Sequence, residues 1–121
     1  MSVRGVGIDL IELARVRDTL ARHGARFLEK VLSEEERAYV AGLPDPVPHV
    51  AARIAAKEAA FKALQAAGLA SPVSWLQVAV RRDDAGRPTL VVPEADAAGL
   101  RLHLSLTHGE LVAAAVVIAE G

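Results

Sequence analysis

The first half of the chain carries its hydrophobic residues mainly at helical spacing. A short apolar strand at residues 3–10 precedes a segment in which apolar residues recur every three or four positions, up to Gly24, a residue typical of helix ends. The motif Ser33-Glu34-Glu35-Glu36 is a capping box, in which the serine and the last glutamate satisfy each other's backbone amides. It predicts a second helix that ends near Gly42, before a proline-rich loop at residues 43–48.

The longest helical pattern covers residues 49–67, and beyond it the hydrophobic residues alternate with polar ones. This alternation predicts one strand at residues 76–80 and another at 100–107. The turn sequence Asp83-Asp84-Ala85-Gly86 is expected to join the first of them to a return strand at residues 89–92.

A short connection at residues 93–99, with at most a helical turn, and a last strand at 112–119 complete the pattern. Helices gathered in the first half and hairpins in the second predict an α+β fold, with an antiparallel sheet packed on the long helix. Because 121 residues leave room for only one hydrophobic core, we expect a single domain over residues 1–121.

The composition indicates how this core is built. Hydrophobic residues make up 52% of the chain but aromatic residues only 3%, so the core must consist of small aliphatic side chains. Such side chains bury little area each, and the alternating leucines at residues 100–106 would need cover. We therefore expect neighbouring subunits to cover part of the apolar surface.

Several classes of protein are disfavoured. A chain without cysteine forms no disulfide and no thiolate metal site. The formal net charge of −1 argues against a general nucleic-acid-binding protein. The sequence shows neither a signal-peptide pattern nor an apolar run that could span a membrane, so we expect a cytoplasmic protein without membrane contact.

Two acidic residues stand where a carboxylate is costly without a partner. Asp9 closes the first strand, and Glu58 shares a stripe of the long helix with Ile54 and Phe61. A hard divalent cation such as Mg²⁺ would use both carboxylates. Each has a structural alternative, because Asp9 can cap the following helix and Glu58 can pair with Lys62 one turn later.

Two glycines accompany Asp9 in the first strand. Gly5 and Gly7 lie on the same face as Asp9, and glycine weakens a strand unless something must approach closely. They indicate that a neighbouring backbone or a ligand lies against this face.

Basic residues on the long helix suit an anion with several charges. Arg53, Lys57 and Lys62 are the cations that a polyphosphate would need, although the same residues are compatible with a solvated helix face. Gly86-Arg87-Pro88 is first of all a hairpin turn, whose backbone and arginine could touch a phosphate secondarily.

The segment Ser105-Leu106-Thr107-His108-Gly109 ends a strand in mostly polar or small residues. A Ser–His pair suggests a hydrolase, but no acid is placed to orient the histidine and no nucleophile elbow is present. A histidine at a strand end more commonly makes a hydrogen bond or binds an anion.

The first predicted helix and its exit carry excess positive charge. The basic residues outnumber the acidic ones there: Arg15, Arg17, Arg22, Arg26 and Lys30 against Asp18 and Glu29. This excess fits either a solvated helix face or a dock for an acidic partner.

Together and in this order, these features resemble the holo-acyl-carrier-protein synthases, the small phosphopantetheinyl transferases. The stretch Gly5-Val6-Gly7-Ile8-Asp9-Leu10-Ile11-Glu12-Leu13-Ala14-Arg15-Val16 is similar to the opening motif of that family. Arg53-Ile54-Ala55-Ala56-Lys57-Glu58-Ala59-Ala60-Phe61-Lys62-Ala63 is similar to its central helix motif. Trp75, Gly86-Arg87-Pro88 and Ser105-Leu106-Thr107-His108 then follow in the family's order, so the resemblance covers nearly the whole chain.

The resemblance implies that 4′-phosphopantetheine is transferred from coenzyme A to a serine of an apo acyl carrier protein, which leaves adenosine 3′,5′-bisphosphate. It also implies a homotrimer with active sites between subunits. The resemblance implies that Asp9 and Glu58 bind Mg²⁺ and that Glu58 and Lys62 act in catalysis. It implies carrier-protein binding by Arg15, with Arg22 and Arg26 as further candidates. The residues implied to bind the coenzyme are Arg53, Lys57, Lys62, Gly86, Arg87, Pro88, Ser105, Thr107 and His108.

Two other functions stay open at this stage. One is a non-catalytic homologue that binds the carrier protein, against which the intact Asp9, Glu58 and Lys62 count. The other is a Mg²⁺-dependent nucleotide pyrophosphohydrolase, since the same charges would suit attack by water. The arginine-rich first helix disfavours the hydrolase, which needs no dock for an acidic protein.

Overall fold

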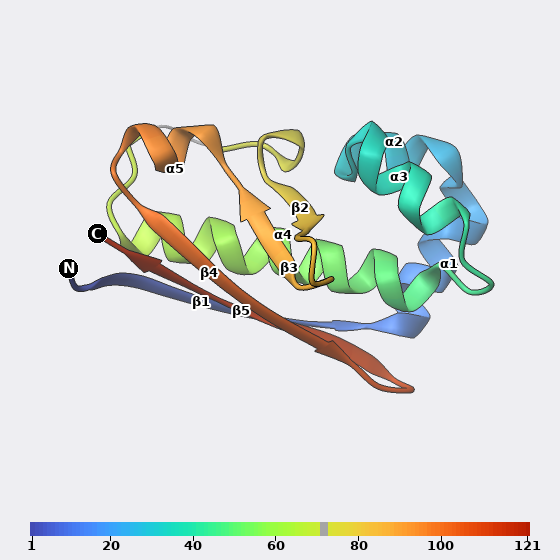
Figure 1. Ribbon diagram of the computed structural model, residues 1–121. Helices are drawn as coiled ribbons and strands as arrows, with labels where there is room; N and C mark the ends of the chain where they lie inside the picture. The colour runs from blue at the N-terminus through green and yellow to red at the C-terminus, as the bar shows by residue number, and fades with distance from the viewer. Residues whose placement is uncertain (71–72) are drawn as a thin grey trace.

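The chain forms an α+β fold in which a long helix packs on one face of an antiparallel sheet (Figure 1). The computed structural model describes residues 1–70 and 73–121. Three strands form the sheet in the order β1-β5-β4, and β2 and β3 form a separate hairpin. The elements in chain order are β1 (Val3–Glu12), α1 (Leu13–His23), α2 (Ala25–Val31), α3 (Glu34–Ala41), α4 (Val47–Ala66), η1 (Trp75–Gln77), β2 (Ala79–Arg82), β3 (Pro88–Val91), α5 (Pro93–Ala97), β4 (Arg101–His108) and β5 (Val112–Glu120). The fold class expected from the sequence is confirmed.

The helix α4 lies directly against β1, because the strand has glycines where the two backbones meet. A side chain at Gly5 would overlap the carbonyl oxygen of Ala63, and one at Gly7 would overlap that of Ala59. The sequence-based expectation of a close backbone at these glycines is confirmed. This contact determines where Asp9, two residues beyond Gly7, lies relative to α4.

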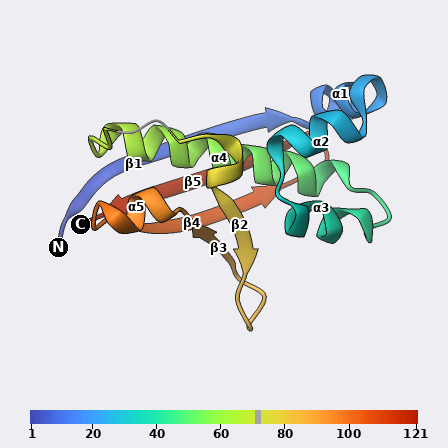
Figure 2. The ribbon, with the colours of Figure 1, turned by 90° about the horizontal axis from the view of Figure 1, so that it is seen from above.

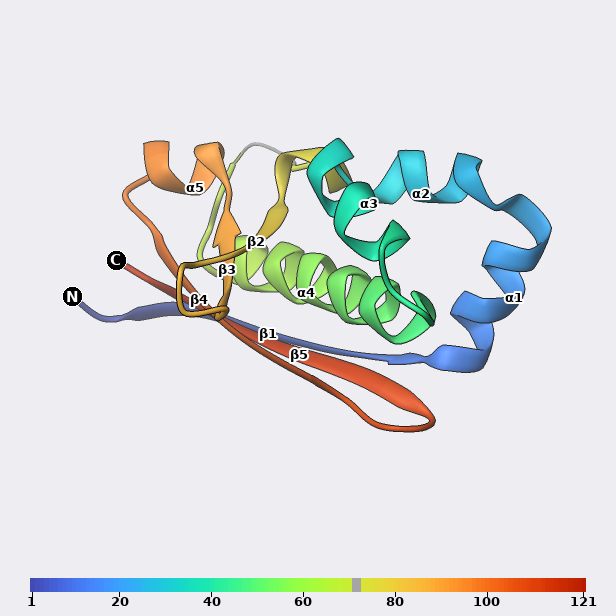
Figure 3. The same cartoon turned by 45° about the vertical axis from the view of Figure 1, so that its right-hand side comes forward.

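The sheet is covered on one face only. The helix α4 lies on that face, and α2, α3, α5 and the hairpin lie on the same side of the sheet, as two views show (Figures 1 and 3). On the opposite face, Val6, Ile8 and Leu10 of β1 are 55%, 66% and 62% exposed. The alternating leucines of β4, in contrast, pack against the protein's own core. The apolar surface in need of cover is therefore on β1 and not on β4.

Several local signals gave the correct elements. Gly24, with a φ of 51°, ends α1, and the capping box of Ser33 and Glu36 begins α3. The turn at residues 83–86 is present with Gly86 at a φ of 82°, and the hairpin it closes projects from the side of the molecule (Figure 2).

Other expectations were wrong in detail. The loop at residues 43–48 is shorter than expected, since α4 begins at Val47 and Pro48 lies in its first turn, where a helix does not need the missing N–H. The helix α2 was not expected. The strand expected at 76–80 begins only at Ala79, because η1 occupies the residues before it. Within the described residues, none of the helices has the length and apolar character needed to cross a lipid bilayer.

Candidate active site

Asp9 and Glu58 line one pocket of about 370 Å³, which we call the acid pocket and define by Asp9, Arg15, Phe27, Ile54 and Glu58. The end of β1 brings Asp9 to this pocket, and α4 brings Glu58. The glycine contact described above holds these two elements together. The expectation that these carboxylates lie in one place, although they are far apart in the sequence, agrees with this geometry.

The structure does not form either structural alternative for these carboxylates. The residue at the N-cap of α1 is Glu12, so Asp9 does not cap the helix. Lys62 pairs with Asp9 and not with Glu58: its ammonium donates to Asp9 Oδ1 at 3.2 Å and to the carbonyl oxygen of Ile8 at 3.0 Å. Glu58 has no ion-pair partner among the residues that the structure describes.

The surroundings of Glu58 disfavour its ionised form. Burial raises the pKa of the Glu58 carboxyl above its usual value, the neighbouring charge of Asp9 raises it further, and Lys62 opposes the shift. A bound cation would stabilise the ionised carboxylate of Glu58 and so oppose this rise in its pKa. Across residues 1–70 and 73–121, no three acidic, histidine or cysteine side chains converge on one point. Glu12 also lines the acid pocket but does not converge with Asp9 and Glu58 on one point. Asp9 and Glu58 are therefore the pair on offer, which fits Mg²⁺, an ion that commonly takes one or two carboxylates together with phosphate oxygens and water.

A second pocket, of about 300 Å³, lies on another side of α4, and the titratable side chains that line it are basic. We call it the cation pocket and define it by His49, Arg53, Arg82, Pro88, Thr107 and His108. Arg53 and Glu58 are five residues apart on α4, which separates their directions by about 140°. Within the described part of the chain, no carboxylate is among the residues that line the cation pocket.

Arg53 is held in the cation pocket by aromatic and backbone contacts. The side chain is only 5% exposed. Its guanidinium carbon lies 4.5 Å from the centre of the Tyr39 ring, and that of Arg82 lies 5.2 Å from the same ring. Arg53 Nη1 donates to the carbonyl oxygen of His49 at 3.4 Å, whereas Nε is buried and without a partner in the described structure. The positive charge of the two guanidinium groups is what favours an anion in this pocket.

Lys57 does not contribute to either pocket, so its expected contact with a phosphate is not supported. The side chain is fully buried, and its ammonium donates to Glu36 Oε1 at 2.8 Å and to the carbonyl oxygens of Val31 at 2.8 Å and Trp75 at 3.0 Å. An ammonium has three donors, and all of them are used. Glu36 Oε2 in turn accepts the N–H of Val80 at 3.1 Å. Lys57 therefore joins α2, α3, η1 and β2 to α4.

The other expected coenzyme residues are only partly brought together. Pro88, Thr107 and His108 line the cation pocket. Gly86 and Arg87 lie at the hairpin turn, where Arg87 Nε pairs with Asp83 Oδ2 at 2.9 Å. Ser105 is exposed on β4 and does not line this pocket.

The sequence reasoning missed Tyr39, His49 and Arg82. A signal for His49 was present, because it precedes Arg53 by four residues and so lies on the same helix face.

The expected docking arginines are in different surroundings. Arg15 is exposed and lines the acid pocket, as Asp9 and Glu58 do. Arg22 is exposed and pairs with Asp18 at 3.2 Å within the same helix. Arg26 is exposed on α2.

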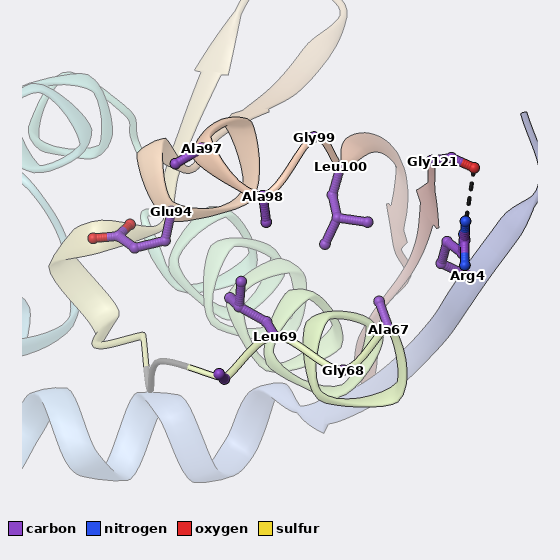
Figure 4. A pocket seen from close by; sticks show the side chains of 11 residues that line it. Arg4, Ala67, Gly68, Leu69, Glu94, Ala97, Ala98, Gly99, Leu100 and Gly121 are labelled. Atoms are coloured by element: carbon purple, nitrogen blue, oxygen red, sulfur yellow. Dashed lines mark hydrogen bonds between the residues drawn. The ribbon is translucent and has the colours of Figure 1, made fainter.

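A further cavity of about 570 Å³ lies at the C-terminal end of α4 (Figure 4). Its charged side chains are Arg4, which donates to the carbonyl oxygen of Gly121 at 3.4 Å, and Glu94, which accepts from Gln77 at 2.8 Å. This cavity contains none of the residues that the sequence marks as catalytic or binding.

Comparisons with known proteins identify the family and the fold. A family model described as the 4′-phosphopantetheinyl transferase superfamily matches residues 5–117. A holo-[acyl-carrier-protein] synthase of Chlamydia trachomatis serovar L2 is 44% identical over 119 residues, which cover 96% of this chain and 98% of the relative. The fold is similar to that of the Bacillus anthracis holo-(acyl-carrier-protein) synthase in complex with CoA (3′,5′-ADP), with a TM-score of 0.80, 36% identity and coverage of 97% and 96% of the two chains. For the Helicobacter pylori holo-[acyl-carrier-protein] synthase in complex with coenzyme A, the TM-score is 0.79 at 27% identity, with coverage of 95% of this chain and 99% of the other.

Proposed function

Because this chain belongs to the 4′-phosphopantetheinyl transferase superfamily, we propose that it transfers 4′-phosphopantetheine from coenzyme A to a serine of an apo acyl carrier protein, with Mg²⁺ bound by Asp9 and Glu58. The observation that carries this proposal is the acid pocket, where Asp9, which pairs with Lys62, shares the lining with Glu58 and Arg15. Adenosine 3′,5′-bisphosphate would be the second product.

The chemistry follows from the charges in the acid pocket. The serine oxygen forms a bond to the phosphorus that carries pantetheine, and the bond from that phosphorus to the bridging oxygen of the pyrophosphate breaks. Mg²⁺ would supply a Lewis acid that neutralises charge on the pyrophosphate oxygens. Glu58, directly or through a water molecule, takes the proton of the serine hydroxyl. Lys62 leaves Asp9 to neutralise charge on the attacked or leaving phosphate.

The split between the two pockets supports an active site between subunits. Among the residues that the structure describes, the acid pocket and the cation pocket share none in their linings. A coenzyme that uses both can do so when the acid pocket of one subunit faces the cation pocket of the next. The exposed residues Val6, Ile8 and Leu10 of β1 give the apolar surface that such an assembly would bury. We therefore include a homotrimer in the proposal.

Arg15 supports a protein acceptor over water. This arginine is exposed, it lines the acid pocket, and it lies on the helix with the excess of positive charge. An acidic carrier protein bound there would bring its serine to the carboxylates, whereas a hydrolase of free nucleotides gains nothing from this surface.

The experiment that tests the proposal is an intact-mass measurement of an apo acyl carrier protein after incubation with this protein, coenzyme A and Mg²⁺. We expect the carrier protein to gain the mass of one phosphopantetheine group, and we expect no gain without Mg²⁺ or with the Asp9→Asn variant. Glu29→Gln, which changes an exposed carboxylate on α2, is the matched control and should keep full activity. Hydrolysis of coenzyme A without a change in the carrier protein would support the pyrophosphohydrolase instead, and binding without either reaction would support the non-catalytic homologue.

A further inference from the structure

His49 lies in the cation pocket with basic side chains around it. Its ring centre is 5.5 Å from that of His108 on β4 and 6.2 Å from that of Tyr39 on α3, and both pairs meet edge to face. His49 lines the cation pocket together with Arg53 of α4 and Arg82 of β2. The sequence motifs that resemble the family do not include this residue.

The charges that face His49 disfavour its protonated form in the free protein. Burial lowers the pKa of the His49 imidazole below its usual value, and the nearby charges of His108, Arg53 and Arg82 lower it further. The one opposing charge is Asp45, which precedes α4 and is itself bonded to Arg17 Nη2 at 3.1 Å. His49 is therefore largely neutral near pH 7 while the cation pocket is empty.

An anion in the cation pocket favours the protonated form of His49 over the neutral one. A phosphate monoester carries close to two negative charges near pH 7, and in the pocket it would face His49, Arg53, Arg82 and His108. Its charge favours the protonated imidazole, which then adds a donor and a positive charge to the contact.

We propose that His49 is a further ligand-contacting residue of the cation pocket, and that it takes up a proton when the phosphate monoester of the coenzyme binds there. This inference rests on the proposed function, which supplies the ligand: coenzyme A and adenosine 3′,5′-bisphosphate both carry a 3′-phosphate monoester. Dephospho-coenzyme A lacks that group and is the matched control ligand.

The proton uptake has a defined consequence for affinity. Below the pKa of His49 in the free protein, the imidazole is charged before binding and the contact with the anion is complete. As the pH rises through the pKa of the complex, the proton is lost and the affinity falls. Each unit by which the ligand raises the pKa of His49 corresponds to about a tenfold change in affinity.

The test is titration calorimetry of the metal-free protein with adenosine 3′,5′-bisphosphate, in two buffers that differ in ionisation enthalpy and at several values between pH 6 and about 8.5. The number of protons taken up follows from the difference in enthalpy between the buffers. We expect the wild-type protein to take up a fraction of a proton near pH 7. We expect less uptake in His49→Phe, which keeps an aromatic ring, and in His49→Gln, which keeps a polar side chain.

The affinity gap between the wild-type protein and both variants should be greatest at the lowest pH and should close as the pH rises. Because the ligand's own ionisation is the same in each titration, it cancels from the difference between the wild-type protein and the His49 variants. His23→Gln removes an exposed histidine at the end of α1 and should behave as wild type. Dephospho-coenzyme A should bind the wild-type protein and the His49 variants equally.

Equal proton uptake in the wild-type protein and both His49 variants would overturn the inference and leave the proposed function intact. Equal loss of affinity for coenzyme A and dephospho-coenzyme A in the variants would overturn the assignment to the monoester. If the wild-type protein failed to bind adenosine 3′,5′-bisphosphate at every pH, both the inference and the proposed binding of coenzyme A would be contradicted.

Discussion

A Cβ atom placed on Gly7 would lie 1.8 Å from the carbonyl oxygen of Ala59, and one on Gly5 would lie 2.1 Å from that of Ala63. These distances are far shorter than any van der Waals contact, so β1 touches the backbone of α4 without intervening side chains. The contact sets the depth at which the end of β1 meets the middle of α4. Asp9, Glu58 and Lys62 come together because of it.

Gly7→Ala should therefore separate β1 from α4. Overpacking of a tight interface costs about 1–3 kcal/mol, and two backbones cannot move aside as a side chain can, so we expect a loss of about 3 kcal/mol in the free energy of unfolding. Denaturant unfolding measures this loss. Gly109→Ala is the control, because its added methyl group meets nothing within 4 Å and its backbone has no positive φ. Equal stability of the two variants would show that the close contact does not hold the strand.

The buried pair of Lys57 and Glu36 should be a major contributor to stability. Lys57→Met leaves a buried carboxylate without its cation, which costs about 3–5 kcal/mol. Arg81→Ala breaks an exposed pair with Glu35 and should cost at most about 1 kcal/mol. Unfolding in urea compares the two variants. If Lys57→Met were as stable as Arg81→Ala, and lost its affinity for coenzyme A instead, Lys57 would be a ligand for phosphate as the sequence suggested.

Lys57 also shows where sequence reasoning reached its limit. Elements with strong local signals were predictable, such as the capping box at Ser33 and the turn that ends at Gly86. Asp9 and Glu58 were identified because a carboxylate is unusual at a strand end and in an apolar stripe. Lys57 was misplaced because the direction of a residue on a helix depends on what packs around that helix. The partner Glu36 already had a local explanation as a cap, so nothing in the sequence marked it as buried.

The proximity of His49 and Arg82 in the cation pocket was missed because it, too, depends on the tertiary fold. They come from α4 and β2, which the tertiary fold brings together around Tyr39. No spacing in the sequence links a hairpin residue to a helix residue that precedes it by 33 positions (82 − 49). The helix α2 was missed because Gly24, which ends α1, also serves as the N-cap of the next helix.

The exposed face of β1 should lie in the interface between subunits. Ile8→Glu places a charge at the centre of the apolar stripe, which should dissociate the proposed trimer and abolish transfer while each chain stays folded. Sedimentation equilibrium of the wild-type protein and of this variant measures the oligomeric state. Leu111→Glu, at an exposed residue between β4 and β5, is the control. A wild-type protein that is active as a monomer would contradict the shared site.

Arg15 should act on the carrier protein and not on coenzyme A. Arg15→Glu should raise the Michaelis constant for the carrier protein strongly, and added salt should produce a similar defect in the unchanged protein, since exposed charges act mainly through association. Steady-state kinetics with each substrate varied in turn separates the two effects. A rise confined to the Michaelis constant for coenzyme A would show that α1 is not the docking surface.

We propose that one active site uses the acid pocket of one subunit and the cation pocket of the next. Complementation between two impaired variants tests this arrangement. Glu58→Gln impairs the acid pocket, and His108→Ala removes a charged contact from the cation pocket, a loss of about 1.5–3 kcal/mol or roughly 10- to 100-fold in activity. The two variants are co-expressed with different affinity tags and purified over both columns, so that every oligomer contains both.

A mixed trimer contains two copies of one variant and one copy of the other. In either case, one of its three sites combines an unchanged acid pocket with an unchanged cation pocket. We therefore predict that mixed trimers modify an apo acyl carrier protein at about one third of the wild-type rate, as measured by intact mass. Each variant alone should be far less active. The contrary result is mixed trimers no more active than the average of the two variants alone. That result would show that both pockets act within a single chain, or that they do not serve one reaction, and it would contradict a site shared between subunits.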